Sequence, residues 1–292
     1  MNTWHLRYLR VTLRTPLHIG DRPLGFVSRA LPFVPSHIPV MALVPTAVQK
    51  LGFPDERSQY VRMQKFLEQH LRFTPLFIRN EATGQPMIPT DNQMEQIELH
   101  IVNARYGIAV NYGERSAREG GLYEIEAVSP LSRYGAPTIM EGYLFWKAGQ
   151  DGDLSLNSQG ELNQHPLHDL LALSQWGGER SKGYGSLASV ELNDMGGKKT
   201  IWQDAAVATD TDEPIVEWPC GQAAPFYLRY DPAFTHEIKG RIIPLSGRLY
   251  DPERGSGQAA PAGNIVWDMG WKSSMLKRLR LGVKVTSSLF LA

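Results

Sequence analysis

The stretch Gly177-Gly-Glu-Arg-Ser-Lys-Gly-Tyr-Gly-Ser186 decides how the sequence is interpreted, because four glycines surround two cations and an aromatic residue. Glycine permits positive φ angles and a close approach of the backbone to a ligand. Arg180 and Lys182 add positive charge where successive N–H groups can form an anion-binding nest. The alternative is an ordinary glycine turn, which requires neither cations nor an aromatic residue. The stretch therefore predicts a loop that binds phosphate groups.

The segments on either side place this loop between a helix and a strand. Residues 166–173 carry a compact helical apolar face, and residues 187–192 are typical of a strand. A dinucleotide-binding loop has the reverse order, from strand to helix, and a P-loop requires GxxxxGK followed by Ser or Thr, which this sequence lacks. The core Lys182-Gly-Tyr-Gly185 matches only the first half of the RNA-recognition-motif signature, because the later stacking aromatics are missing.

The order of helix, GGERSKGYG loop and strand closely resembles the glycine-rich loop of the RAMP superfamily of CRISPR-associated proteins. The form GGER-S-x-G-x-G is most similar to the Cas-five-type subunit of type III effector complexes. Other segments resemble further motifs of the superfamily in the same order: 15–20 (TPLHIG) the first-strand motif, 33–52 the "IPS then first helix" segment, and 105–123 the protruding thumb hairpin with its terminal Gly-Leu-Tyr. Together these motifs cover about residues 12–192. Residues 266–271 and 284–290 resemble the closing strands.

This resemblance implies an α+β fold of two ferredoxin-like (RRM-like) units with a glycine-rich loop and a protruding thumb β-hairpin. Residues 1–200 are expected to form the N-terminal unit, with the thumb at about 104–122 and the glycine-rich loop at 177–186. Residues 201–213 are expected to be a linker, since 205–213 are mostly small or acidic. Residues 214–292 are expected to form a strand-rich second unit.

The function implied by the resemblance is that of a non-catalytic RNA-binding subunit of a type III CRISPR effector in antiviral defence. Such a subunit holds the 5′ repeat-derived handle of the crRNA and caps one end of the complex. Its partners would be the crRNA, the large cyclase-type subunit, a backbone RAMP subunit and, through the complex, target RNA. No cofactor, metal or catalytic residue is expected. The candidate RNA-binding residues are Gly177, Gly178, Arg180, Ser181, Lys182, Gly183, Tyr184, Gly185, His18, Ser36, Arg105, Arg115, Arg118 and Tyr123.

Composition limits these possibilities. The 292 residues carry 30 basic and 30 acidic side chains, so the chain lacks the overall positive charge of a free-standing nucleic-acid binder, and RNA contacts must be local. Cys220 is the only cysteine, which excludes an intrachain disulfide framework and fits a reducing cytoplasm. The uncharged stretch 30–49 contains four prolines and predicts a buried loop and helix rather than a membrane span.

Hydrophobic periodicity predicts the elements that support the loop. Residues 4–14 alternate as a half-buried strand, and residues 55–71 have the spacing of an amphipathic helix. We expect further strands at 73–78, 98–102, 122–128 and 140–146, and a projecting insertion at 107–121. In the second part, strands are expected at 226–230, 241–250, 265–269 and 281–290. Residues 252–263, rich in Gly, Pro and Ala, predict a mobile loop.

The main alternative function is a metal-independent endoribonuclease that processes CRISPR repeat RNA, with His18 or His37 as general base. Against it, the sequence places no second titratable group beside His18, and His37 follows Ser36 in a helix-cap context. Residues 165–169 contain two histidines and an aspartate without a third ligand motif, so a helix start is favoured over a metal site. A third possibility is a small-phosphate-binding protein unrelated to CRISPR.

The hairpin and the C-terminal part add two further groups of cations. Tyr106 and Tyr112 lie among the hairpin arginines, although Glu114 and Glu119 dilute its charge, so a solvated hairpin stays open as an alternative to an RNA contact. The sequence 277–280 (KRLR) with Lys284 is the densest basic cluster. It predicts equally an RNA contact and the solvent face of an alternating strand.

Overall fold

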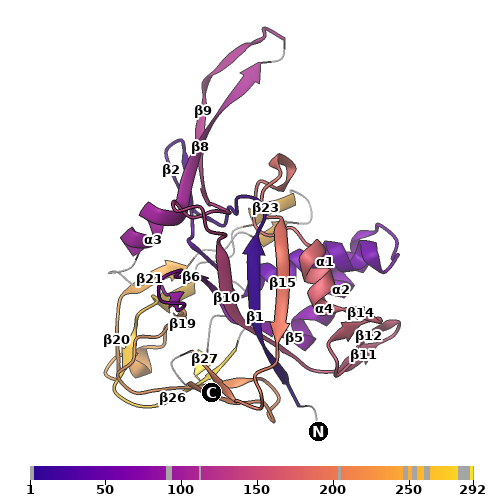
Figure 1. Ribbon diagram of the computed structural model, residues 1–292, viewed down its shortest axis with the longest axis vertical. Helices are drawn as coiled ribbons and strands as arrows, with labels where there is room; N and C mark the ends of the chain where they lie inside the picture. Colours follow the sequence, from indigo (N-terminus) through magenta and orange to yellow (C-terminus); the bar gives the residue numbers. More distant parts are fainter. Residues whose placement is uncertain are drawn as a thin grey trace.

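The computed structural model describes residues 3–89, 94–111, 113–202, 205–245, 249–251, 255–259, 264–281 and 290–291. Figure 1 shows a central sheet with helices on one side, small sheets of the C-terminal part on the other, and a long hairpin that projects from one end. Helices and strands are both abundant and the strands form several separate sheets. The predicted α+β class is confirmed.

The central sheet is antiparallel and has seven strands. Its main order is β15-β1-β10-β6-β4, with β5 paired to β10 and β7 paired to β6. The strands are β1 (His5–Leu13), β4 (Phe33–Val34), β5 (Leu71–Phe73), β6 (Leu76–Arg79), β7 (Pro86–Met87), β10 (Ile139–Trp146) and β15 (Leu187–Asn193). The strands predicted at 4–14, 140–146 and 187–192 lie in this sheet, whereas the single strand predicted at 73–78 is divided between the end of β5 and β6.

Three helices cover one face of the central sheet. They are α1 (His37–Lys50), α2 (Arg57–His70) and α4 (Leu167–Leu173). In α2 the buried residues Met63, Phe66 and Leu67 recur at helical spacing, as the sequence predicted. Among the elements of the central layer, the chain order is β1, the pair α1 and α2, β6, β10, α4 and β15. Leaving the inserted elements aside, this is the order of a split βαβ unit. This order is compatible with the ferredoxin-like fold implied for the first unit.

Alternation along the strands divides the interior into two hydrophobic clusters. On β10, Met140 and Leu144 face the helices and join the first cluster, whereas Phe145 faces the opposite side and joins the second. The second cluster also contains Trp218, Phe226 and other residues of the C-terminal part. The central sheet is therefore buried on both faces over much of its area.

Two smaller sheets flank the central sheet. One contains β2 (Gly20–Leu24), β3 (Val27–Ala30), β9 (Ser116–Val128) and β8 (Val102–Asn111), in that order. Strands β8 and β9 form the projecting hairpin in Figure 1. The other contains β11 (Gly149–Asp151), β12 (Leu154–Leu156), β13 (Glu161–Leu162) and β14 (His165–Pro166). Helix α3 (Met94–Ile101) precedes β8, so the strand predicted at 98–102 is wrong.

The C-terminal part is built from strands. Its five-stranded sheet contains β16 (Thr200–Ile201), β17 (Ala205–Ala208), β18 (Ile215–Trp218), β26 (Lys277–Arg280) and β27 (Phe290–Leu291). Smaller sheets contain β19 (Leu228–Arg229), β24 (Asn264–Trp267) and β21 (Ile242–Leu245), then β20 (Ile238–Lys239) with β25 (Lys272–Ser273), and β22 (Leu249–Asp251) with β23 (Gly255–Ala259). One short 3-10 helix, η2 (Pro232–Phe234), is present. In the described residues after 200 there is no α-helix, so the helices of a second ferredoxin-like unit are not seen there.

Two segments differ from the expected loops. Residues 205–208, expected within a linker, form β17, and Ala205 and Val207 are buried in the second cluster. Their period-two alternation extends over only four residues, too few to stand out in the sequence. Residues 255–259, expected within a mobile loop, form β23 and pair with β22. None of the helices in the described part of the chain is long and apolar enough to cross a membrane.

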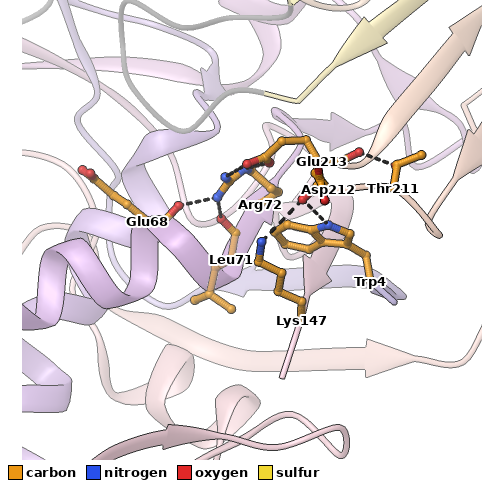
Figure 2. Close-up of polar contacts among 8 residues, drawn as sticks. All are labelled: Trp4, Glu68, Leu71, Arg72, Lys147, Thr211, Asp212 and Glu213. Carbon is orange, nitrogen blue, oxygen red and sulfur yellow. Dashed lines mark hydrogen bonds and ion pairs between the residues drawn. The ribbon is translucent and has the colours of Figure 1, made fainter. Parts of the chain in front are cut away.

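Figure 2 shows how residues 211–213 are fixed next to the central sheet. The guanidinium of Arg72, of which 7 % is exposed, forms a two-pronged ion pair with Glu213 at 2.7 and 2.9 Å and also donates to the carbonyl of Glu68. Two cations lie near the Trp4 ring, with the guanidinium carbon of Arg72 5.2 Å and the ammonium of Lys147 4.9 Å from its centre. Its Nε1 donates to the carbonyl of Asp212 at 3.1 Å. These contacts join the two parts of the chain.

Candidate RNA-binding site

The glycine-rich loop is closed at its base by backbone hydrogen bonds. The N–H of Trp176 donates to the carbonyl of Gly185 at 2.9 Å, and the N–H of Gly185 donates to the carbonyl of Pro16 at 2.8 Å. Gly185 has a φ of +80°, and a Cβ atom there would lie 1.9 Å from the carbonyl oxygen of Trp176. Only glycine fits this position.

The first-strand motif packs directly against the loop. Gly177 has a φ of +76°, and a Cβ atom at this position would lie 2.3 Å from the carbonyl oxygen of His18. The N–H of Gly178 donates to the same oxygen at 2.9 Å. The structure thus brings together two motifs that are about 160 residues apart in the sequence.

His18 is a packed side chain and does not present its ring to solvent. Its exposed fraction is 6 %, its Nδ1 lies 2.6 Å from the carbonyl oxygen of Glu126, and its Nε2 lies 3.5 Å from the hydroxyl of Ser28. The ring therefore links β9 and β3 beneath the loop. The prediction of a direct RNA contact by the His18 side chain does not fit this burial.

The tip of the loop is a single 3-10 turn, η1 (Arg180–Lys182). Glu179 before it and Gly183 after it both have left-handed conformations, with φ of 56° and 84°. The N–H of Gly183 donates to the carbonyl of Arg180 at 3.0 Å. In this structure the N–H of Gly183 closes the 3-10 turn and the N–H of Gly178 binds the first-strand motif, so neither donor is available to an RNA backbone.

The two cations of the loop have different surroundings. The ammonium of Lys182 lies 2.7 Å from Glu179 Oε2 and 4.6 Å from the centre of the Tyr123 ring. The hydrogen bond to Glu179 raises the pKa of Lys182. Arg180 is exposed and makes no side-chain hydrogen bond or ion pair within the described part of the chain. Arg180 is therefore the loop cation that is free to contact an anion.

Tyr184 does not serve the role predicted for it. Only 4 % of Tyr184 is exposed, and its ring packs in a small cluster with Ile125 and Ala127 of β9, against which Tyr123 also packs. In this structure the enclosed ring is not available to stack on a base. The burial instead attaches the glycine-rich loop to the base of the hairpin.

The hairpin carries its cations in exposed positions. Arg105, Arg115 and Arg118 are exposed and have no side-chain partner among the residues that the structure describes. In the β8–β9 register, Arg105 is opposite Ile125 and Gly107 is opposite Tyr123, so Arg105 lies on the face that meets the loop. Arg115 lies at the turn with a φ of 53°. Tyr112 lies outside the described residues.

The opposite face of the hairpin has an apolar character that sequence reasoning missed. Tyr106, Ile108 and Leu122 are exposed by 71 %, 55 % and 48 %, and Ile108 is directly opposite Leu122. The alternation in 104–108 was the available signal. Glu179 was also missed. In the sequence, a carboxylate near two cations only lowers the local positive charge, and its ion pair with Lys182 is apparent only in the structure.

Ser36 and His37 lie at the start of α1. Ser36 is the N-cap residue, but its side chain makes no capping hydrogen bond. Burial lowers the pKa of His37 to about 4, so this imidazole is neutral near pH 7. No hydrogen bond or ion pair between described residues joins Ser36 to the glycine-rich loop.

The basic cluster at 277–280 follows the alternating pattern of a strand. Lys277 is buried, forms an ion pair with Glu237 and lies over the ring of Phe234. Arg278 is exposed and lies 3.4 Å from Glu217. These pairings neutralise much of the cluster. Lys284 lies outside the described residues.

Comparisons with known proteins give no match by sequence but many among solved structures. No family model matches the chain, and no curated protein matches it by sequence. Among solved structures, a chain of the type III-B Cmr-beta complex bound to cognate target RNA and AMPPnP is similar over 93 % of this chain and 86 % of its own length, with 11 % identity and a TM-score of 0.45. A chain of the same complex bound to cognate target RNA has 14 % identity and a TM-score of 0.44 over the same shares of both chains. A chain of the apo complex has 8 % identity and a TM-score of 0.36 over 64 % of this chain and 96 % of its own length. Identities and TM-scores this low do not establish a family or a function for this chain.

Proposed function

We propose that this protein is a non-catalytic subunit of a type III CRISPR effector complex that binds the 5′ repeat-derived handle of the crRNA. The observation that carries the proposal is that the glycine-rich loop packs against the base of the hairpin. Tyr184 packs on β9, and Lys182 lies over Tyr123. The two segments that most resemble RAMP motifs therefore form one surface in space.

The charges on this surface suit an RNA backbone. Arg180 on the loop and Arg105, Arg115 and Arg118 on the hairpin are exposed and free of partners in the described structure. Because the whole chain has a formal net charge of zero, such a cluster is a local feature. Clustered free cations bind phosphates mainly through counterion release.

Within the loop, we assign the phosphate contact to Arg180 and a positioning role to Lys182. The ammonium of Lys182 already contacts Glu179 and the Tyr123 ring, so fewer of its hydrogen-bond donors remain for RNA. Arg180 presents a planar guanidinium with five donors, a geometry that matches phosphate oxygens. This division refines the expectation that both cations contact RNA equally.

The remaining parts of the proposal come from the sequence resemblance. The chain would cap one end of the effector, between the large cyclase-type subunit and a backbone RAMP subunit. Target RNA would be contacted only through the assembled complex. The same resemblance implies a role in antiviral defence, and the single cysteine fits a reducing cytoplasm.

The proposal is tested by the salt dependence of binding to repeat-derived single-stranded RNA. Arg180→Ala should reduce the slope of log K against log salt by about 0.7, the value for one lost phosphate contact on a single strand. Lys198→Ala is the matched control, because Lys198 is exposed and free of partners but lies on a different turn. Equal slopes for the wild type and both variants contradict the phosphate contact.

The alternative is a repeat-processing ribonuclease. Its candidate base His18 is buried, with both ring nitrogens near protein partners, and burial keeps His37 neutral. General base catalysis requires the ring within hydrogen-bond reach of a substrate hydroxyl. Incubation of the protein with repeat RNA in EDTA separates the two functions. Specific cleavage that His18→Ala or His37→Ala abolishes would establish the ribonuclease and overturn the proposal.

A further inference from the structure

A cleft of about 540 Å³ lies along the outer face of α2, on the helical side of the molecule. Seven of the residues that line it belong to α2, and Asp151 at the end of β11 closes one side. Neither the glycine-rich loop nor the hairpin contributes to this lining. The cleft is thus a separate feature from the candidate RNA-binding site.

Arg62 fixes the β11–β12 segment, which forms one side of the cleft. Its Nη2 lies 2.6 Å from Asp153 Oδ1 and donates to the carbonyl of Asp151 at 2.6 Å. These contacts tie the β11–β12 turn to α2. The charge of Arg62 is therefore used within the protein, and Arg62 fixes the shape of the cleft.

Two other cations in the cleft remain free. Arg57 and Lys65 are exposed and make no side-chain hydrogen bond or ion pair within the described residues. The nearby carboxylates of Asp55 and Glu56 accept hydrogen bonds from Tyr60 and Ser58 instead. Eight residues separate Arg57 from Lys65, which places them roughly 12 Å apart along the helix axis. The cleft lining holds three cations and one carboxylate, an excess of positive charge.

The surface between the two free cations is apolar. Val61 lies midway between them in the sequence and is 39 % exposed, while Phe66 lies beneath with 1 % exposure. Arg57, Val61 and Lys65 recur at a spacing of four, so they form one stripe on the helix. A complementary partner offers an apolar side chain flanked by two carboxylates.

We propose that this cleft docks an acidic amphipathic helix of a partner protein. Carboxylates eight residues apart on such a helix, with a leucine midway, match Arg57, Lys65 and Val61 when the helix lies along α2. RNA fits less well, because the lining contains no exposed aromatic ring for base stacking and Asp151 is exposed at the edge. The partner is identified by this chemistry alone, and the proposal does not depend on the RNA-binding function.

The test uses the full chain and a labelled synthetic helical peptide of about four turns, with Glu at positions i and i+8, Leu at i+4 and Ala or Gln elsewhere. Fluorescence anisotropy should show saturable binding. Arg57→Glu with Lys65→Glu should weaken it by about tenfold or more and should allow a matched peptide with Lys in place of Glu to bind. Lys198→Glu, outside the cleft, should leave binding of the Glu peptide unchanged.

Both substitutions are expected to leave the fold intact. Both substituted side chains are exposed, and glutamate at the first position of α2 interacts favourably with the helix dipole. If the double reversal unfolds, Arg57→Gln with Lys65→Gln serves instead, and its circular dichroism is checked first. The proposal is overturned by an absence of saturable binding to the wild type, by an equal loss in Lys198→Glu, or by a cleft variant that loses RNA affinity while keeping peptide affinity.

Discussion

The ammonium group of Lys182 lies 4.6 Å from the centre of the Tyr123 ring, and this contact joins the glycine-rich loop to the hairpin. The same ring fills the space next to Gly107, where a Cβ atom would lie 2.3 Å from it. Lys182, Tyr123 and the backbone of Gly107 therefore form one stack. Its members come from three different segments of the chain.

This stack should be measurable as an energetic coupling. In a double-mutant cycle with Lys182→Met and Tyr123→Leu, we expect a coupling of about 0.5–1 kcal/mol in the free energy of unfolding, as for a cation–π pair near the surface. Tyr123→Phe retains the ring and should lose less than Tyr123→Leu. A coupling indistinguishable from zero would show that the loop and the hairpin are positioned independently.

The glycines of the loop should differ sharply in their tolerance of substitution. Gly185→Ala introduces a Cβ atom 1.9 Å from a backbone oxygen as well as a strained φ, so we expect a loss of more than about 2 kcal/mol in unfolding free energy. Gly183→Ala has the strain without the clash, because open space surrounds it, and should cost about 1 kcal/mol. Urea denaturation of both variants checks the order, and equal losses would contradict the geometry.

Much of the architecture could be predicted from the sequence, because long periodic segments such as 57–70 reveal their buried face. Shorter segments could not be assigned. The short segment 98–102 fits a strand or the end of a helix equally well, and in the structure 98–101 end α3 while Val102 begins β8. The alternation at 205–208 is too short to distinguish a strand from a linker.

The candidate site was likewise predicted from the sequence only in part. The sequence identified the loop and the hairpin separately as candidate RNA-binding segments, and it assigned Tyr184 to the surface. Its burial depends on Ile125 and Ala127, about 60 residues earlier, and on the turn that directs its ring toward β9. Local sequence around a glycine-rich loop does not contain this information. The roles of Lys182 and Glu179 likewise depend on which of the two loop cations forms an ion pair within the protein.

The ion pair between Arg72 and Glu213 should contribute more to stability than any exposed pair. Glu213→Gln leaves a guanidinium that is 7 % exposed without its carboxylate, so we expect a loss of about 3 kcal/mol in the free energy of unfolding. Glu217→Gln, which breaks the exposed pair with Arg278, is the matched control and should cost less than about 1 kcal/mol. Similar losses in thermal or urea unfolding would show that Figure 2 depicts a minor contact.

His37 should make stability depend on pH. Burial lowers its pKa to about 4 in the folded chain, against about 6.5 when unfolded, so the unfolded state binds more protons between these values. Its contribution is present in full above about pH 6.5 and is lost progressively as the pH falls toward 4, by up to about 3 kcal/mol. His37→Gln should remove this part of the slope. Parallel stability curves for the wild type and the variant over this range would contradict the burial.

The last prediction separates the hairpin's role in RNA binding from its role in folding. The β8–β9 hairpin projects from the molecule in Figure 1, and Arg115 and Arg118 are exposed on it. Replacing 107–121 with a short glycine linker keeps the base of the hairpin, where Arg105 pairs with Ile125. Because loop-closure entropy changes slowly with length, the variant should fold, with a small change in unfolding free energy.

For the same variant, the slope of log K against log salt for single-stranded repeat RNA should fall by about 1.4, from the loss of two arginine contacts at about 0.7 each. Arg115→Ala with Arg118→Ala in the intact hairpin is the matched comparison. If the double substitution reproduces the deletion, charge is the contribution of the hairpin. If the deletion weakens binding much more, the exposed apolar face with Ile108 contributes as well. An unchanged slope in both variants would remove the hairpin from the RNA-binding surface and leave the glycine-rich loop as its centre.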